Sequence, residues 1–165
     1  MRPLIILLLL SVSAIVKAQE ENPLSIFDAL IGKTWAIEAK WGNGSFFKQE
    51  VSFRYGLEGN AVFAETKGFV DTEGEEFGDR NFGVRKFDKE SDKILFWEFD
   101  TFGGVTTGEV QLKGKNTWYV YEYGGTTLAD IWEYVDEETY IYKVAQYTDG
   151  KMGDVYLEGV YKLMK

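Results

Sequence analysis

The chain has 165 residues, of which 18 are basic and 27 acidic, so its formal net charge at neutral pH is −9. It contains no cysteine and no histidine. This composition excludes disulfide bonds and nucleophile–histidine catalytic pairs, and it removes the usual ligands of zinc. The acidic balance disfavours nucleic acids and anionic lipid surfaces as partners.

The first 18 residues have the pattern of a secretory signal peptide. Arg2 gives a positive start, Leu4 to Val16 form an apolar stretch, and Val16-Lys17-Ala18 fits a small-residue cleavage site. The stretch is too short to span a bilayer comfortably, although an uncleaved N-terminal anchor is the alternative. Removing residues 1–18 takes away Arg2 and Lys17 but no acid, which leaves 147 residues and a net charge of −11. We therefore expect a secreted or periplasmic monomer of one domain with no membrane span after cleavage.

Residues 19–31 are expected to form a polar leader and one short helix. Four apolar residues of this segment have helical spacing: Leu24, Phe27, Leu30 and Ile31. Ser25 is expected to cap the helix and Gly32 to end it. Such a helix directly before the first strand is suited to plug one end of a barrel.

Residues 32–165 are expected to form a single β-barrel domain. Nine turn signals rich in Gly, Asn and Asp divide this region into short segments with many β-branched and aromatic residues. The predicted strands are Thr34–Trp41, Phe46–Tyr55, Ala61–Val70, Arg80–Asp88, Lys93–Asp100, Val105–Leu112, Thr117–Tyr123, Thr127–Val135, Thr139–Tyr147 and Asp154–Leu163.

The short connections favour an up-and-down meander, in which each strand lies beside the next. A sheet of about ten strands tends to curl, and closing it removes the exposed edges. The predicted fold is therefore all-β: an antiparallel up-and-down β-barrel of about ten strands, preceded by a short helix. A barrel of this size contains a cavity unless large side chains fill it.

Apolar residues alternate along many strands and are expected to form the core. On the segment from Lys93 to Asp100, Leu95, Trp97 and Phe99 share one face, which is expected to point inward. Glu98 lies on the opposite face and is expected to meet solvent. The chain also has 5 Trp, 10 Tyr and 12 Phe, so the interior is expected to be aromatic, with some polar atoms.

Four polar residues interrupt the apolar alternation: Gln49, Arg80, Asp130 and Gln146. Arg80 shares its predicted strand face with Phe82 and Val84. If these faces point inward, burial without a partner costs several kcal/mol for each group. Three interpretations remain open. The four side chains orient the polar end of a ligand, they satisfy one another or buried water, or the assigned faces are shifted by one residue.

The segment Leu30-Ile31-Gly32-Lys33-Thr34-Trp35 resembles the opening of calycin proteins, the group of lipocalins and fatty-acid-binding proteins. It departs from their motif because two residues, not one, separate Gly32 from Trp35. Two later segments, Phe96 to Asp100 and Leu128 to Glu133, resemble an uncharacterised group of small secreted bacterial calycin-like proteins. The resemblance implies a barrel around a small, often apolar molecule. It implies no catalytic residue, and the missing histidine disfavours haem ligation.

The sequence thus predicts a protein that binds a small apolar or amphipathic molecule, without a cofactor, a metal or a catalytic residue. The residues expected to line the cavity are Trp35, Phe47, Gln49, Arg80, Trp97, Tyr119, Tyr121, Asp130, Trp132 and Tyr142. One alternative is an enzyme that uses carboxylate or tyrosine acid–base chemistry in the same cavity. Another is a structural or interaction domain whose barrel is filled.

Overall fold

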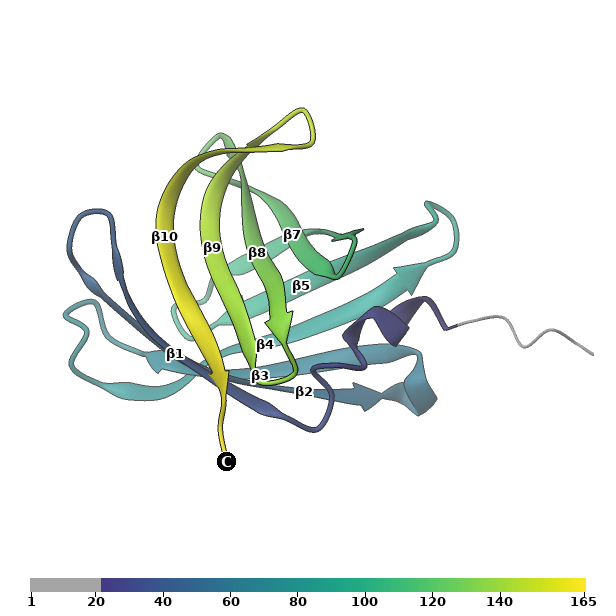
Figure 1. Ribbon diagram of the computed structural model, residues 1–165, viewed down its shortest axis with the longest axis horizontal. Helices are drawn as coiled ribbons and strands as arrows, with labels where there is room; N and C mark the ends of the chain where they lie inside the picture. The colour runs from purple at the N-terminus through teal and green to yellow at the C-terminus, as the bar shows by residue number, and fades with distance from the viewer. Residues whose placement is uncertain (1–21) are drawn as a thin grey trace, which may run out of the picture.

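The computed structural model describes residues 22–165, which form a barrel of ten antiparallel strands (Figure 1). The expected signal peptide, residues 1–18, lies outside the described residues. Two short 3-10 helices accompany the strands, η1 over Pro23–Phe27 and η2 over Leu57–Gly59. The strands are β1 Thr34–Trp41, β2 Phe46–Gly56, β3 Ala61–Phe69, β4 Phe77–Asp88, β5 Lys93–Asp100, β6 Val105–Lys113, β7 Asn116–Tyr123, β8 Thr126–Asp136, β9 Thr139–Thr148 and β10 Lys151–Leu163.

The barrel is closed because β1 pairs with both β2 and β10, while every other strand pairs with its neighbours in sequence. The predicted all-β, ten-stranded up-and-down barrel is therefore confirmed. Each strand begins and ends within three residues of its predicted bounds. In Figure 1, strands β7 to β10 rise steeply over the flatter layer of β1 to β5.

Alternation of burial along the strands shows why the sequence forms this sheet. In β1, for example, Trp35 and Ile37 are buried on the inner face, whereas Glu38 lies on the outer face and is exposed. Short connections join the strands: Gly124 and Gly125 form the two-residue link between β7 and β8, and both have a positive φ. Glycine suits these positions because a side chain would strain a left-handed backbone.

The segment before β1 is helical, but over a shorter stretch than the sequence predicts. The 3-10 helix η1 covers Pro23–Phe27, and the Asn22 side chain, rather than that of Ser25, caps it by accepting from the backbone N–H of Leu24 at 3.0 Å. A single turn suffices here because its role is to bury Leu24 and Phe27 against the barrel. None of the helices among residues 22–165 has the length and apolar character needed to cross a membrane.

The main core runs from η1 into the barrel interior and contains most of the buried aromatic side chains. A second, smaller core lies on the outer face of β7, β8 and β9. It consists of the buried side chains of Val120, Ala129, Ile131 and Ala145, with Trp118 and Tyr147 packed against it. Burial therefore does not mark the inside of the barrel by itself, since this stretch of wall also buries outward-facing residues.

Candidate functional site

One end of the barrel is covered by η1, and we call it the helix end. Leu24, Phe27 and Leu30 are at most 3% exposed there and belong to the main core. The hydroxyl of Tyr55, near the end of β2, donates to the Asp28 carboxylate at 2.6 Å and lies 3.1 Å from the carbonyl oxygen of Leu24. These contacts hold the segment against the strand ends, so the chain itself closes this end.

Aromatic rings fill the interior next to the helix end. The rings of Trp132 and Tyr161 stack at 4.1 Å with an angle of 10° between their planes. Tyr140 packs edge-on against both Trp35, at 5.0 Å, and Trp132, at 5.7 Å. Close packing of this kind leaves no room for a ligand in this half of the barrel.

A buried ion pair lies at the middle of the interior. Arg85 on β4 is 5% exposed, and its Nη2 pairs with Oε1 of Glu98 on β5. Its Nε donates to the hydroxyl oxygen of Tyr119 on β7 at 3.3 Å. Burial opposes the charge of Arg85, but Tyr119 and Glu98 together outweigh it, so its pKa is raised above the ordinary value. Arg85 therefore carries a full positive charge inside the barrel.

Gly83 makes room for this ion pair. It faces inward on β4, and a Cβ atom built on it would overlap Nη1 of Arg85 and both carboxylate oxygens of Glu98. Gly78 on the same strand contrasts with it, because the nearest atom to its Cβ position is a methyl group of Val70 at 3.4 Å. The inward glycine is thus a requirement of the ion pair.

Asp130 on β8 forms a second polar group in the same interior. Its two carboxylate oxygens accept from the hydroxyls of Tyr121, at 2.9 Å, and Tyr142, at 2.8 Å. Burial raises the pKa of Asp130 to about 6; the two tyrosine hydrogen bonds counteract this rise and the charge of Glu98 adds to it. This carboxyl group therefore titrates close to neutral pH rather than in the usual acidic range.

These groups surround a small cavity of about 90 Å³, the interior cavity. Its polar walls come from Gln49, Thr66, Asn81, Arg85, Glu98 and Asp130. The volume matches about three water molecules, each with a share of about 30 Å³ in the liquid. Within residues 22–165, no group of three or more carboxylates is placed to hold a metal ion.

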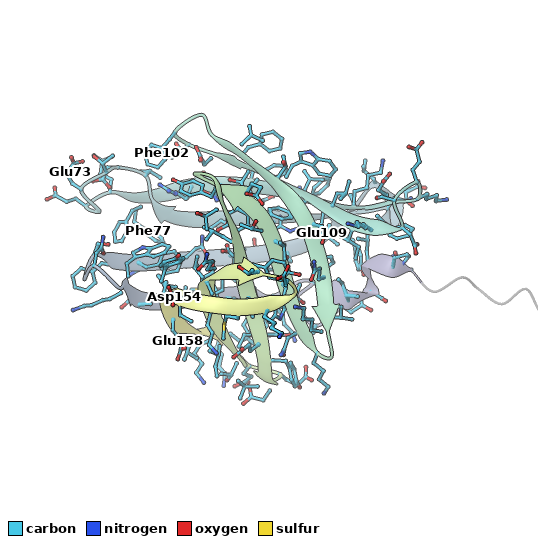
Figure 2. All side chains as sticks on the ribbon, turned by 90° about the horizontal axis from the view of Figure 1, so that it is seen from above. Glu73, Phe77, Phe102, Glu109, Asp154 and Glu158 are labelled. Carbon is cyan, nitrogen blue, oxygen red and sulfur yellow. The ribbon has the colours of Figure 1, made fainter. Side chains whose placement is uncertain are left out.

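The opposite end of the barrel is open, and we call it the mouth. It is formed by the loops at residues 42–45, 70–76, 101–104 and 124–125. The 149–150 turn folds over the outer wall, where the carbonyl oxygen of Gly150 accepts from Lys113 at 2.7 Å. Figure 2 shows Glu73, Phe77 and Phe102 together at this end of the molecule, opposite η1. Phe46 and Phe102 are 70% and 51% exposed, so large apolar side chains meet solvent around the opening.

A pocket of about 530 Å³ lies at the mouth, between the β1–β2 hairpin, the 70–76 loop and Phe102. Its aromatic lining is Trp41, Phe46, Phe47, Phe69 and Phe102. The guanidinium of Arg80 lies 4.4 Å from the Phe102 ring centre and donates to the Phe69 carbonyl oxygen at 2.7 Å. Gln49 lines both this mouth pocket and the interior cavity.

Two larger hollows, of about 630 and 840 Å³, lie against the barrel wall. Their linings include outward-facing residues such as Glu65 and Lys67 on β3 and Trp97 on β5. Both open on the outer surface, although the first also touches Thr66 and Asn81 and the second Phe96 and Tyr121. Neither contains the ion pair of Arg85 with Glu98. The mouth pocket with the interior cavity below it is therefore the candidate functional site.

The structure places most of the predicted site residues inside the barrel, although their contact with a ligand remains a prediction. Tyr119, Asp130, Trp132 and Tyr142 line the interior cavity together with Gln49. Phe47 and Arg80 line the mouth pocket, again with Gln49. Tyr121 reaches Asp130 from β7, and Trp35 lies in the filled half next to the helix end.

The predicted inward face of β5 is wrong. Phe96 and Glu98 lie opposite inward residues of β4, whereas Trp97 pairs with Val84 on the outer face. Trp97 therefore lies outside the cavity that it was expected to line, and Glu98 is inside it rather than in solvent. The physical reason is that β5 carries large apolar residues on both faces, since its outward side chains cover the wall.

The predicted face of β4 is also displaced. Arg80 was grouped with Phe82 and Val84, but these two residues face outward. A register shift opposite Thr66 interrupts the alternation in β4. Arg80 packs against Gly68 on the inner face and lies at the mouth. Beyond the shift, inward and outward positions are exchanged relative to those expected from Arg80, so Phe82 and Val84 point outward.

Sequence reasoning missed Arg85, Glu98 and Asn81, which supply much of the polar wall. The signal that identifies the first two is their opposite charge on neighbouring strands: Glu98 lies directly opposite Gly83, and Arg85 lies two residues beyond Gly83 on β4. Recognising it requires the register between β4 and β5, which the alternation within either strand does not give.

No family model and no curated protein sequence matches this chain. Among solved structures, a redesigned β-barrel is similar with a TM-score of 0.44 and 10% identity, over 84% of this chain and 94% of that one. The S-type phycobiliprotein lyase CPES from Guillardia theta is similar with a TM-score of 0.46 and 7% identity, over 87% of this chain and 92% of that one. The ten-stranded antiparallel barrel is established by the chain's own structure, and membership of the calycin proteins remains a prediction.

Proposed function

We propose that this protein binds a small apolar or amphipathic molecule, which enters through the mouth and rests in the mouth pocket. The observation that carries this proposal is the 530 Å³ pocket lined by five aromatic side chains above a buried polar cavity. Ligand pockets in proteins commonly have volumes of about 300–1,000 Å³ and combine apolar walls with a few polar groups. The filled half of the barrel then serves as a rigid base.

In this proposal the aromatic side chains supply affinity and the polar ones supply orientation. The rings of Phe47 and Phe102 remove the apolar part of the ligand from water, which contributes about 25 cal/mol for each Å² buried. Gln49 lies between the two spaces and is positioned to contact a polar end that points inward. The protein would do this as a secreted or periplasmic monomer after removal of residues 1–18.

The test is native mass spectrometry of protein purified without denaturation, followed by thermal shift with a panel of lipophilic compounds. We expect a bound mass or a panel member that stabilises the fold. Phe102→Ala should weaken binding at least fivefold because its ring lines the mouth pocket. Phe82→Ala is the matched control, since Phe82 is 40% exposed on the outer face of β4. An empty protein that no compound stabilises, or equal loss in both variants, contradicts the proposal.

A second candidate is an enzyme that uses acid–base chemistry, and one observation favours it. Glu98 and Asp130 line the same cavity, and the Asp130 pKa of about 6 suits proton transfer near neutral pH. This candidate predicts that a bound compound changes mass during incubation and that Asp130→Asn abolishes the change while binding persists. A compound that binds and is recovered unchanged supports the binding protein instead.

A further inference from the structure

The hydrogen-bonding groups of the interior cavity constrain what it accepts. Three buried atoms around it have no hydrogen-bond partner among the described residues: Nη1 of Arg85, Oε2 of Glu98 and Oδ1 of Asn81. One of them is a donor and two are acceptors. Leaving such a group unsatisfied costs about 1–3 kcal/mol, so a bound group that satisfies these atoms is favoured.

The charges in the cavity disfavour an anion. Arg85 supplies one positive charge, whereas Glu98 and Asp130 supply two carboxylates. Arg85 already pairs with Glu98, and both oxygens of Asp130 already accept from tyrosine hydroxyls. A carboxylate placed here would therefore meet two carboxylates in a medium of low polarity, and like charges at short range are strongly unfavourable.

The volume sets the size of the group. About 90 Å³ accommodates a polar end of roughly three to five non-hydrogen atoms. A primary carboxamide fits this size and presents one acceptor and two N–H donors, the complement of the three unsatisfied atoms. A hydroxyl offers only one donor, and an ammonium ion offers no acceptor to Arg85.

Resting on the proposed function, we propose that the polar end of the ligand is a neutral carboxamide-like group seated in the interior cavity. Its carbonyl oxygen accepts from Arg85, and its N–H groups donate to Glu98 and Asn81. The apolar part of the ligand extends past Gln49 to the aromatic rings of the mouth pocket. The barrel therefore selects amides over carboxylic acids of the same chain length.

The experiment compares nonanamide with nonanoate, which share an apolar chain and differ in the polar end. Calorimetry at pH 7.5 should give at least tenfold tighter binding for nonanamide. Glu98→Gln should reduce this preference because it removes the negative charge that repels nonanoate. Glu109→Gln is the matched control. Like Glu98, Glu109 pairs with a basic side chain, that of Lys93, but it lies on the outer wall, so its replacement should leave the preference unchanged.

Propionamide separates the head-group inference from the proposed function, because it has almost no apolar chain to occupy the mouth pocket. We expect it to shift the Arg85 Nε–H signal in an NMR titration, while propionate leaves that signal unchanged. If propionamide shifts the signal but neither nine-carbon compound binds, the mouth-pocket function fails and the head-group inference stands. If both nine-carbon compounds bind equally, the function stands and the inference is overturned. If none of the four compounds binds, both the proposed function and the head-group inference are overturned.

Discussion

The helix end and the mouth of the barrel are built from the same alternating strands but treat apolar side chains in opposite ways. At the helix end the chain covers its own apolar surface, and Phe27 is 0% exposed. At the mouth Phe46 and Phe102 are 70% and 51% exposed, and no described segment covers them. The comparison teaches that one end of this barrel contributes stability, while the other leaves apolar side chains exposed to solvent.

The largest effect is expected at the helix end. Phe27→Ala should lower the free energy of unfolding by about 3–4 kcal/mol, because it removes a fully buried ring and leaves a cavity between η1 and the barrel. Urea denaturation followed by tryptophan fluorescence measures this loss. A loss below about 1 kcal/mol would show that η1 does not seal this end.

The ion pair between the two ends should give the next largest effect. Arg85→Met should destabilise the fold by about 3 kcal/mol, since it leaves the carboxylate of Glu98 buried without its partner. The double variant with Glu98→Gln should recover much of that loss, because the orphaned charge is then gone. A double-mutant cycle by urea denaturation tests this, and strictly additive losses would show that the two side chains do not interact.

Asp130 should make stability depend on pH in an unusual direction. Its pKa of about 6 in the folded protein lies above its value of about 4 in an unfolded chain, so the folded state binds more protons between these pH values. This group therefore contributes stability below pH 4, and the contribution is lost as pH rises towards 6, by up to about 3 kcal/mol.

The difference between wild type and Asp130→Asn isolates this effect. Other carboxylates have lowered pKa values, among them Asp71, Asp88 and Asp136, and contribute the opposite trend. They are present in both proteins and cancel in the difference. The unfolding free energy of wild type minus that of Asp130→Asn, measured from pH 4 to 7, should fall as the pH rises. If the unfolding free energies of the two proteins change with pH in parallel, the pKa of Asp130 has its ordinary value.

The smallest effect on stability is expected at the mouth. Phe102→Ala should change the free energy of unfolding by less than about 0.5 kcal/mol, because half of the ring already meets solvent. Phe27→Ala is the same chemical change at the other end, so the two variants compare the ends directly in one urea series. A large loss in Phe102→Ala would mean that the mouth aromatics hold the fold together.

The strands and their order could be predicted from sequence, whereas the polar wall of the cavity could not. Turn residues such as Gly124 and Gly125 mark where each strand ends, and short connections leave a meander as the simple arrangement. These signals are local, so they are readable without the fold. Asp130 and Tyr142 were found because they share alternate positions with apolar residues of β8 and β9, whereas in β7 the alternation does not separate Tyr119 from Trp118 and Val120.

The prediction failed where the signal is not local. The register shift opposite Thr66 reverses the phase of β4, and no residue type in β4 announces it. In β5, Trp97 on the outer wall is as large and apolar as Phe96 inside, so counting apolar residues chose the wrong face. Glu98 faces inward because Arg85 neutralises it there, a relation between two strands that neither strand shows alone.

The difference between the ends is tested most directly by mapping where a ligand changes the backbone. In a ¹H–¹⁵N NMR titration with nonanamide, the amide signals of Gly44, Gly74 and Gly103 in the mouth loops should shift, while those of Gly32 and Gly59 at the helix end stay in place. Shifts confined to the helix end, or spread evenly over both ends, would contradict the account.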